Sequence, residues 1–209
     1  MKKTLFPTAY FAPSIQYSAY LKSEKIEIEI HEHFPKQTFR NRAYIMTANG
    51  VFTLSIPLSG RKNHTLTKDI KISTEEDWKK LHWKTIENAY QRSPFFEFYD
   101  TKIEKLYHSK HQFLIDFNQE AESIIADILK VDFDSNFTKD FVPVDNSNYT
   151  DLRLINPKNK DLPLMITENP YLQVFADKFP YSPNLSILDV IFNLGPESTS
   201  HLKQMALTV

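Results

Sequence analysis

The pattern of apolar and polar positions is clearest in the first sixty residues of the chain. Lys25 to Ile30 alternates charged residues with isoleucine at a period of two, which is typical of a half-buried strand with one wet face. A strand over 3–11 and a helix over 14–23, with Ser14 as its cap, precede it. Because strand, helix and strand fall within about thirty residues, we expect a βαβ unit with parallel strands. The same pattern is also compatible with an α+β arrangement.

A β-hairpin is the strongest local prediction. Two apolar runs, at 39–47 and 51–58, flank the sequence Ala48-Asn49-Gly50. Asn-Gly between apolar runs favours a tight turn, because both residues tolerate a positive φ.

Helical spacing dominates the middle of the chain. A helix is predicted from an apolar stripe that recurs every four residues: Trp78, His82, Ile86 and Tyr90, with Leu81 and Ala89 beside it. This helix is expected to begin after Ser73 or Thr74 and to end near residue 92, before Pro94. The aromatic run 94–99 is expected to pack. Periodicity over 100–130 predicts two further helices with a break near 108–111.

Later segments complete the predicted fold. Residues 134–160 are expected to be irregular with one short strand at 141–144, and a helix is predicted over 185–194 between a cap at Asn184 and a stop at Gly195. Residues 201–209 are predicted as a tail. The predicted fold class is α/β, a single domain over 1–209 in which a strand–helix–strand and a hairpin sheet pack with several helices.

Composition excludes several classes of function. The charge balance of 25 Lys and Arg against 26 Asp and Glu gives no reason to expect a nucleic-acid partner. The absence of cysteine excludes disulfides, thiolate metal sites and a cysteine nucleophile, and three glycines are too few for glycine-rich phosphate loops. Neither a signal peptide nor a membrane span is recognised, so we expect a cytoplasmic location. No cofactor is identified, and the oligomeric state is left open.

The residues with the richest chemistry follow the second predicted strand. His31 and Glu32 lie where a parallel strand would end, a common position for groups that act in general acid–base catalysis. His31 and His33 would share a face and form half of a metal site, with His64, His82 or Asp69 as the remaining ligands. Exposed histidines are the simpler interpretation, and we predict no metal site.

A basic group follows directly. Lys36, Arg40, Asn41 and Arg42 form a candidate site for an anionic small molecule such as a nucleotide sugar or sugar phosphate, because guanidinium groups bind phosphate and carboxylate with two hydrogen bonds. The alternative is a solvated strand edge protected by charge.

The predicted central helix contributes the other candidates. His82 is a third candidate catalytic base, although a histidine on an apolar helical stripe is more often a core residue. Trp83 and Tyr90 complete the predicted substrate-binding set at the border of a cleft.

Taken together, several motifs resemble the WbqC-like protein family. They are Pro13…Tyr17, His31-Glu32 followed by Lys36 and Arg40-Asn41-Arg42, ANGVFTLSIP at 48–57, Trp78 with His82-Trp83, AYQRSPFFEFY at 89–99 and NLSILDVIFNLGP at 184–196. Longer members carry a tyrosine- and glycine-containing motif in the C-terminal half, where this chain has PYLQVF and NLSILD.

The resemblance implies a role in the synthesis of a surface polysaccharide such as O-antigen. It also implies transfer of an acyl or amino-acyl group, glycine being one suggestion, onto a sugar or sugar nucleotide. The alternatives are a non-catalytic module that binds other polysaccharide-synthesis enzymes through the aromatic run 94–99, and a nucleotide-binding domain that forms adenylates.

Overall fold

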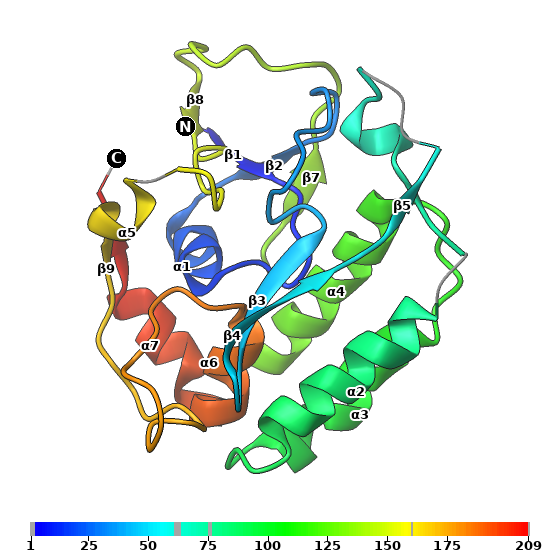
Figure 1. Ribbon diagram of the computed structural model, residues 1–209. Coiled ribbons are helices and arrows are strands. Elements are labelled where there is room, and N and C mark those ends of the chain that lie inside the picture. Colours follow the sequence, from blue (N-terminus) through cyan, green and yellow to red (C-terminus); the bar gives the residue numbers. More distant parts are fainter. Residues whose placement is uncertain (1–2, 61–63, 75–76, 160, 209) are drawn as a thin grey trace.

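The computed structural model describes residues 3–60, 64–74, 77–159 and 161–208 (Figure 1). Its central element is a four-stranded parallel sheet with the order β7-β2-β1-β8. The strands are β1 (Lys3–Pro7), β2 (Ile26–Glu29), β7 (Ser135–Phe137) and β8 (Tyr149–Asp151). Helix α1 (Ser14–Lys22) connects β1 to the parallel strand β2, which confirms the predicted βαβ unit and the α/β class.

Strand β2 is buried on both faces. Ile26 and Ile28 belong to the hydrophobic core, as the alternation predicts, but Glu29 on the other face is 0% exposed. Its carboxylate accepts hydrogen bonds from the Thr138 hydroxyl and the Val142 backbone N–H, because the chain folds over this face after β7. The prediction of one wet face is therefore wrong.

The predicted hairpin is confirmed as β3 (Arg42–Thr47) and β4 (Gly50–Ser55). Thr47 pairs with Gly50 across a two-residue turn, and Gly50 has the positive φ of +97° that glycine adopts without strain. The hairpin forms a sheet of its own rather than joining the parallel one. Two short antiparallel pairs accompany it: β5 (Leu58–Ser59) with β6 (Lys71–Ile72), and β9 (Ile166–Thr167) with β10 (Ala206–Leu207).

The helices form two groups around the sheet (Figure 1). Helix α2 (Trp78–Tyr90) packs against α3 (Phe96–Tyr107), which packs against α4 (Leu114–Leu129). The stripe predicted on α2 is buried, whereas Leu81 beside it is 66% exposed. Helix α1 packs against α6 (Ile187–Leu194) and α7 (Ser198–Gln204). The short elements are α5 (Leu162–Met165) and the 3₁₀ turns η1 (Thr67–Asp69) and η2 (Gly195–Glu197).

Two predicted helix caps are wrong, for a reason that involves long-range contacts. Pro13 occupies the N-cap position of α1, so Ser14 lies inside the helix. Ser186 caps α6 by accepting a hydrogen bond from the Leu188 N–H. Asn184 instead accepts from the Ile15 N–H, and so satisfies a free donor at the start of α1.

Three predicted boundaries also differ from the structure. Helix α2 begins at Trp78, later than predicted, and the acidic pair 75–76 lies outside the described residues. Residues 141–144 form no strand; β7 and β8 lie on either side of them. The predicted tail contains the second half of α7 and the whole of β10. Among the described residues, no helix has the length and apolar character needed to cross a membrane.

Candidate functional site

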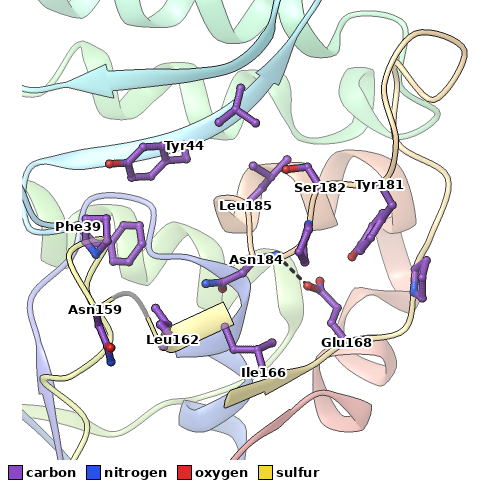
Figure 2. Close-up of a pocket in the computed structure, with 14 residues that line it drawn as sticks. Phe39, Tyr44, Asn159, Leu162, Ile166, Glu168, Tyr181, Ser182, Asn184 and Leu185 are labelled. Atoms are coloured by element: carbon purple, nitrogen blue, oxygen red, sulfur yellow. Dashed lines mark hydrogen bonds between the residues drawn. The ribbon is translucent and has the colours of Figure 1, made fainter. Parts of the chain in front are cut away.

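A pocket of about 570 Å³ is lined by the hairpin, by residues that follow β8 and by the segment before α6 (Figure 2). The chain leaves β1 toward β2 and β7 on one side, and returns as β8 on the other side. In open α/β sheets ligands bind at such a reversal of strand order, outside the carboxyl ends of the strands. Pro157 and Asn159, which follow β8, line the pocket. Its volume is in the range usual for small-molecule sites.

Hydrogen bonds hold other parts of the pocket against the segment that follows β1. The carbonyl of the lining residue Phe39 accepts from the Tyr10 N–H, and the carbonyl of Leu185 accepts from the Ser14 N–H. Tyr44 and Val51 of the hairpin form another wall, and Ile166 of β9 lies opposite Tyr44 in Figure 2. The walls are therefore largely aromatic and aliphatic.

Polar side chains gather at the end of the pocket nearest Glu168, whose side chain is only 2% exposed. One carboxylate oxygen, Oε2, accepts a hydrogen bond of 2.8 Å from the Asn184 N–H, drawn as a dashed line in Figure 2. The other, Oε1, has no hydrogen-bond partner among the described residues. His201 Nε2 lies 3.5 Å from it, so the two side chains form an ion pair when the imidazole is protonated.

The Tyr181 hydroxyl completes this end of the pocket. It lies close enough to the Glu168 carboxylate to interact with it as a donor, although not in the geometry of a full hydrogen bond; burial and this carboxylate raise its pKa. A buried polar atom without a partner is costly, at about 1–3 kcal/mol. The three polar atoms on Glu168, Tyr181 and His201 therefore form a buried group at this end of the pocket, held together by their interactions with the Glu168 carboxylate.

A second buried carboxylate supports the pocket from behind. Asp189 of α6 is 0% exposed and accepts hydrogen bonds from the hydroxyls of Tyr90 and Tyr171 and from the Gln173 amide. Burial raises the pKa of Asp189, and the three hydrogen bonds oppose that rise. The Tyr171 ring contacts the rings of both Tyr181 and His201 edge-on, at 5.4 and 5.0 Å. This network fixes the polar end of the pocket.

The structure places the predicted acid–base residues near the carboxyl edge of the sheet but outside this pocket. His31 Nε2 lies 3.0 Å from the Thr138 carbonyl oxygen. Glu32 forms an ion pair with Arg40, whose side chain is 3% exposed. The Arg40 Nε donates to Glu32 at 2.7 Å, and a second guanidinium nitrogen donates to the same oxygen. The guanidinium expected to bind an anion is thus paired inside the protein.

The other residues of the predicted anion site do not converge with Arg40. Lys36 is exposed, and Asn41 is buried with its amide donating to the Ile56 carbonyl. Arg42 begins β3, and its buried Nε has no hydrogen-bond partner within the described ranges. None of the three lines the pocket.

On α2, His82 is buried, with Nδ1 3.0 Å from the Tyr10 hydroxyl, and burial lowers its pKa to about 4. Trp83 stacks on Phe96. Tyr90 is fully buried and donates to Asp189, so it joins the network behind the pocket. The catalytic and binding roles predicted for these nine residues remain predictions.

The histidines considered for a metal site separate in the structure. His33 lies beside His64 on the surface, with the two Nδ1 atoms 3.4 Å apart, whereas His31 faces Thr138. Among the described residues there is no group of three or more potential metal ligands.

Sequence reasoning missed Glu168, Tyr181, Asn184 as a pocket residue, and His201. They are spread over more than thirty positions, and only Asn184, the first residue of NLSILDVIFNLGP, belongs to a motif that the sequence analysis recognised. One signal was available: a long segment without regular structure inside a compact domain is often functional. The stretch between β9 and α6 is such a segment, and it supplies most of the polar end of the pocket.

The fold and the pocket define a class: an α/β protein with a four-stranded parallel sheet and a pocket of about 570 Å³. The family comparison is more specific, because the model of the WbqC-like protein family matches residues 9–160. The chain therefore belongs to the WbqC-like protein family. Searches of curated proteins and of solved structures gave no significant match.

Proposed function

We propose that the protein is a transferase that attaches an acyl or amino-acyl group to a sugar or sugar nucleotide, and that the sugar ring occupies the pocket of Figure 2. One observation carries this proposal: an aromatic and aliphatic pocket whose hydrogen-bonding groups are concentrated at one end. The apolar faces of a sugar ring pack well on aromatic side chains, while its hydroxyl groups need polar partners at their edge. Phe39 and Tyr44 would provide the first kind of contact, and Asn159, Ser182 and Glu168 the second.

Acyl transfer requires a group that accepts the proton of the attacking amine or hydroxyl. Glu168 suits this role, because its carboxylate belongs to a residue that lines the pocket and its Oε1 lies 3.5 Å from the His201 imidazole. The chain has no cysteine, so we favour direct transfer over a thioester intermediate. The process that we propose, surface polysaccharide synthesis in the cytoplasm, follows from what the family resemblance implies.

A mass-spectrometric assay of sugar nucleotides with activated amino-acid or acyl donors tests the reaction. Glu168→Gln keeps the shape of the side chain and an oxygen for the Asn184 N–H, so we expect a folded protein with about 100-fold lower turnover. Glu87→Gln, on the exposed surface of α2, is the matched control and should leave turnover unchanged. Equal turnover of both variants and the natural protein would remove Glu168 from the mechanism.

A different observation favours the second candidate, a binding module. Phe98 of α3 is 72% exposed and Leu81 of α2 is 66% exposed, although Phe96 in the same aromatic run is buried. Contiguous exposed apolar patches often mark protein contacts, and Phe98 and Leu81 belong to two helices that pack together. Under this alternative Phe98→Ser abolishes co-purification with polysaccharide-synthesis enzymes, whereas under the transferase proposal it leaves turnover intact.

A further inference from the structure

Two histidines outside the pocket lie side by side on the surface of the protein. His33 follows β2, and His64 precedes η1. His33 pairs with Leu66 in an antiparallel bridge, and the Phe34 N–H donates to the Thr65 carbonyl at 2.9 Å. These backbone contacts hold the two segments in a fixed register, so the scaffold itself places the two imidazole rings next to each other.

The two rings direct the same kind of atom toward each other. The Nδ1 atoms of His33 and His64 are 3.4 Å apart, and the ring planes are inclined at 70°. This separation is longer than about 3.2 Å, the upper end for N–H···O hydrogen bonds in proteins. Zinc binds histidine nitrogens at about 2.0–2.1 Å with tetrahedral angles, which places two such nitrogens about 3.3–3.4 Å apart. The pair therefore has the spacing of two ligands of one ion.

The backbone of His64 is in an unusual conformation. Its φ is +67°, in the left-handed region, and its ring lies against the ring of His33 with the centroids 4.9 Å apart. A residue other than glycine in this region costs on the order of 1–3 kcal/mol, and such residues cluster at functional sites, including ligand-binding positions. The strained residue and the short distance between the nitrogens thus coincide at one place.

The pair would leave part of the coordination shell of an ion open. Within the described residues no third histidine, aspartate or glutamate joins His33 and His64 to complete a group of three. His31 is engaged elsewhere, since its Nε2 lies 3.0 Å from the Thr138 carbonyl oxygen. A tetrahedral ion held by two imidazoles keeps two positions for water or for an oxygen of a ligand. Open positions distinguish zinc sites that act on small molecules from structural sites with four protein ligands.

We infer that His33 and His64 bind a zinc ion, or a similar divalent transition-metal ion, through their Nδ1 atoms. Neutral imidazole suits zinc, copper and nickel. The inference goes beyond the proposed function, because neither histidine lines the pocket and the transfer proposed there does not require the ion. It assigns a second ligand site to the surface beside η1.

Isothermal titration of the full chain, without a polyhistidine tag, with zinc chloride at neutral pH tests the inference. We expect one zinc ion per chain. His33→Gln and His64→Asn should each weaken binding at least about tenfold, and asparagine is chosen because it tolerates the left-handed backbone. The matched control is His108→Gln, because the His108 side chain is 74% exposed elsewhere on the surface, and it should leave zinc binding unchanged. Thermal unfolding without zinc verifies that each variant is folded.

Copper provides a second measurement, because Cu²⁺ binds the same nitrogen ligands more strongly than zinc does. The electron paramagnetic resonance spectrum of the protein with one equivalent of Cu²⁺ should show two imidazole nitrogens, and each of the two site variants should lose this signature. A spectrum with a single nitrogen, or no zinc binding by the folded protein, overturns the inference. Equal loss of affinity in His108→Gln and in the site variants identifies adventitious binding by surface histidines only, and also overturns it.

Discussion

His82 gives the protein a predictable sensitivity to acid. Its side chain is buried among aromatic rings, with Trp78 edge-on at 5.1 Å and the Tyr10 hydroxyl at its Nδ1. Burial lowers the pKa of His82 from 6.5 to about 4, so the folded protein keeps this imidazole neutral in a range where an unfolded chain protonates it. The unfolded state then binds more protons, and stability falls as the pH falls from 6.5 to about 4.

The size of the effect follows from the same two values. A pKa difference of one unit corresponds to about 1.4 kcal/mol, so the interval from 6.5 to about 4 gives a loss of about 3 kcal/mol. Since a domain is typically stable by about 5–15 kcal/mol, this is a large fraction of the total.

Urea unfolding across this pH range measures the loss, with His82→Phe as the comparison. Phenylalanine keeps a ring in the core, and the Tyr10 hydroxyl keeps its hydrogen bond with Tyr107. The carboxylates titrate in both proteins and cancel in the difference, which isolates the His82 contribution. We expect the stability of the natural protein relative to His82→Phe to fall by about 3 kcal/mol between pH 6.5 and 4. A constant difference between the two proteins would show that His82 is accessible to protons in the folded state.

Two further predictions concern stability. Arg40→Ala leaves the Glu32 carboxylate without its buried partner, so chemical denaturation should show that the free energy of unfolding falls by about 3–5 kcal/mol. Any loss of turnover must be compared at equal folded fraction. A fall below about 1 kcal/mol would mean that the pair is solvated. Gly195 has a φ of +52°, and a Cβ added by Gly195→Ala would overlap the Phe95 ring. We expect the free energy of unfolding to fall by about 1–3 kcal/mol, seen as a lower melting temperature. An unchanged melting temperature would contradict this packing.

Local patterns predict the elements in which short-range signals and packing agree. Gly50, with its positive φ of +97°, specifies the hairpin turn over Ala48 and Asn49, and the isoleucines of β2 specify the inner face of the strand. Strands β7 and β8 were missed because each has three residues, Ser135–Phe137 and Tyr149–Asp151, too few for a period of two to be recognised. They are strands because they add to the edges of a sheet that β1 and β2 already form.

The candidate site was harder to predict than the fold, because closeness in sequence does not give convergence in space. His31, Glu32 and Arg40 are close along the chain, yet the chain leaves β2 at Ile30 and their side chains turn to different internal partners. Glu168 and His201 come together only because β9 and β10 pair and bring both ends of the C-terminal segment to one place. No periodicity or motif encodes such a contact.

The extent of the family match bears on how function transfers to this chain. Residues 9–160 include most of the parallel sheet, the hairpin and the pocket residues Phe39, Tyr44 and Asn159. Glu168 and Tyr181, at the polar end of the pocket, lie beyond that range. Family membership therefore accounts for most of the scaffold and one wall of the pocket, while the polar end belongs to the segment after residue 160. What the family implies about function extends to the scaffold of this chain, whereas the role of the residues at the polar end has to be tested in this protein itself.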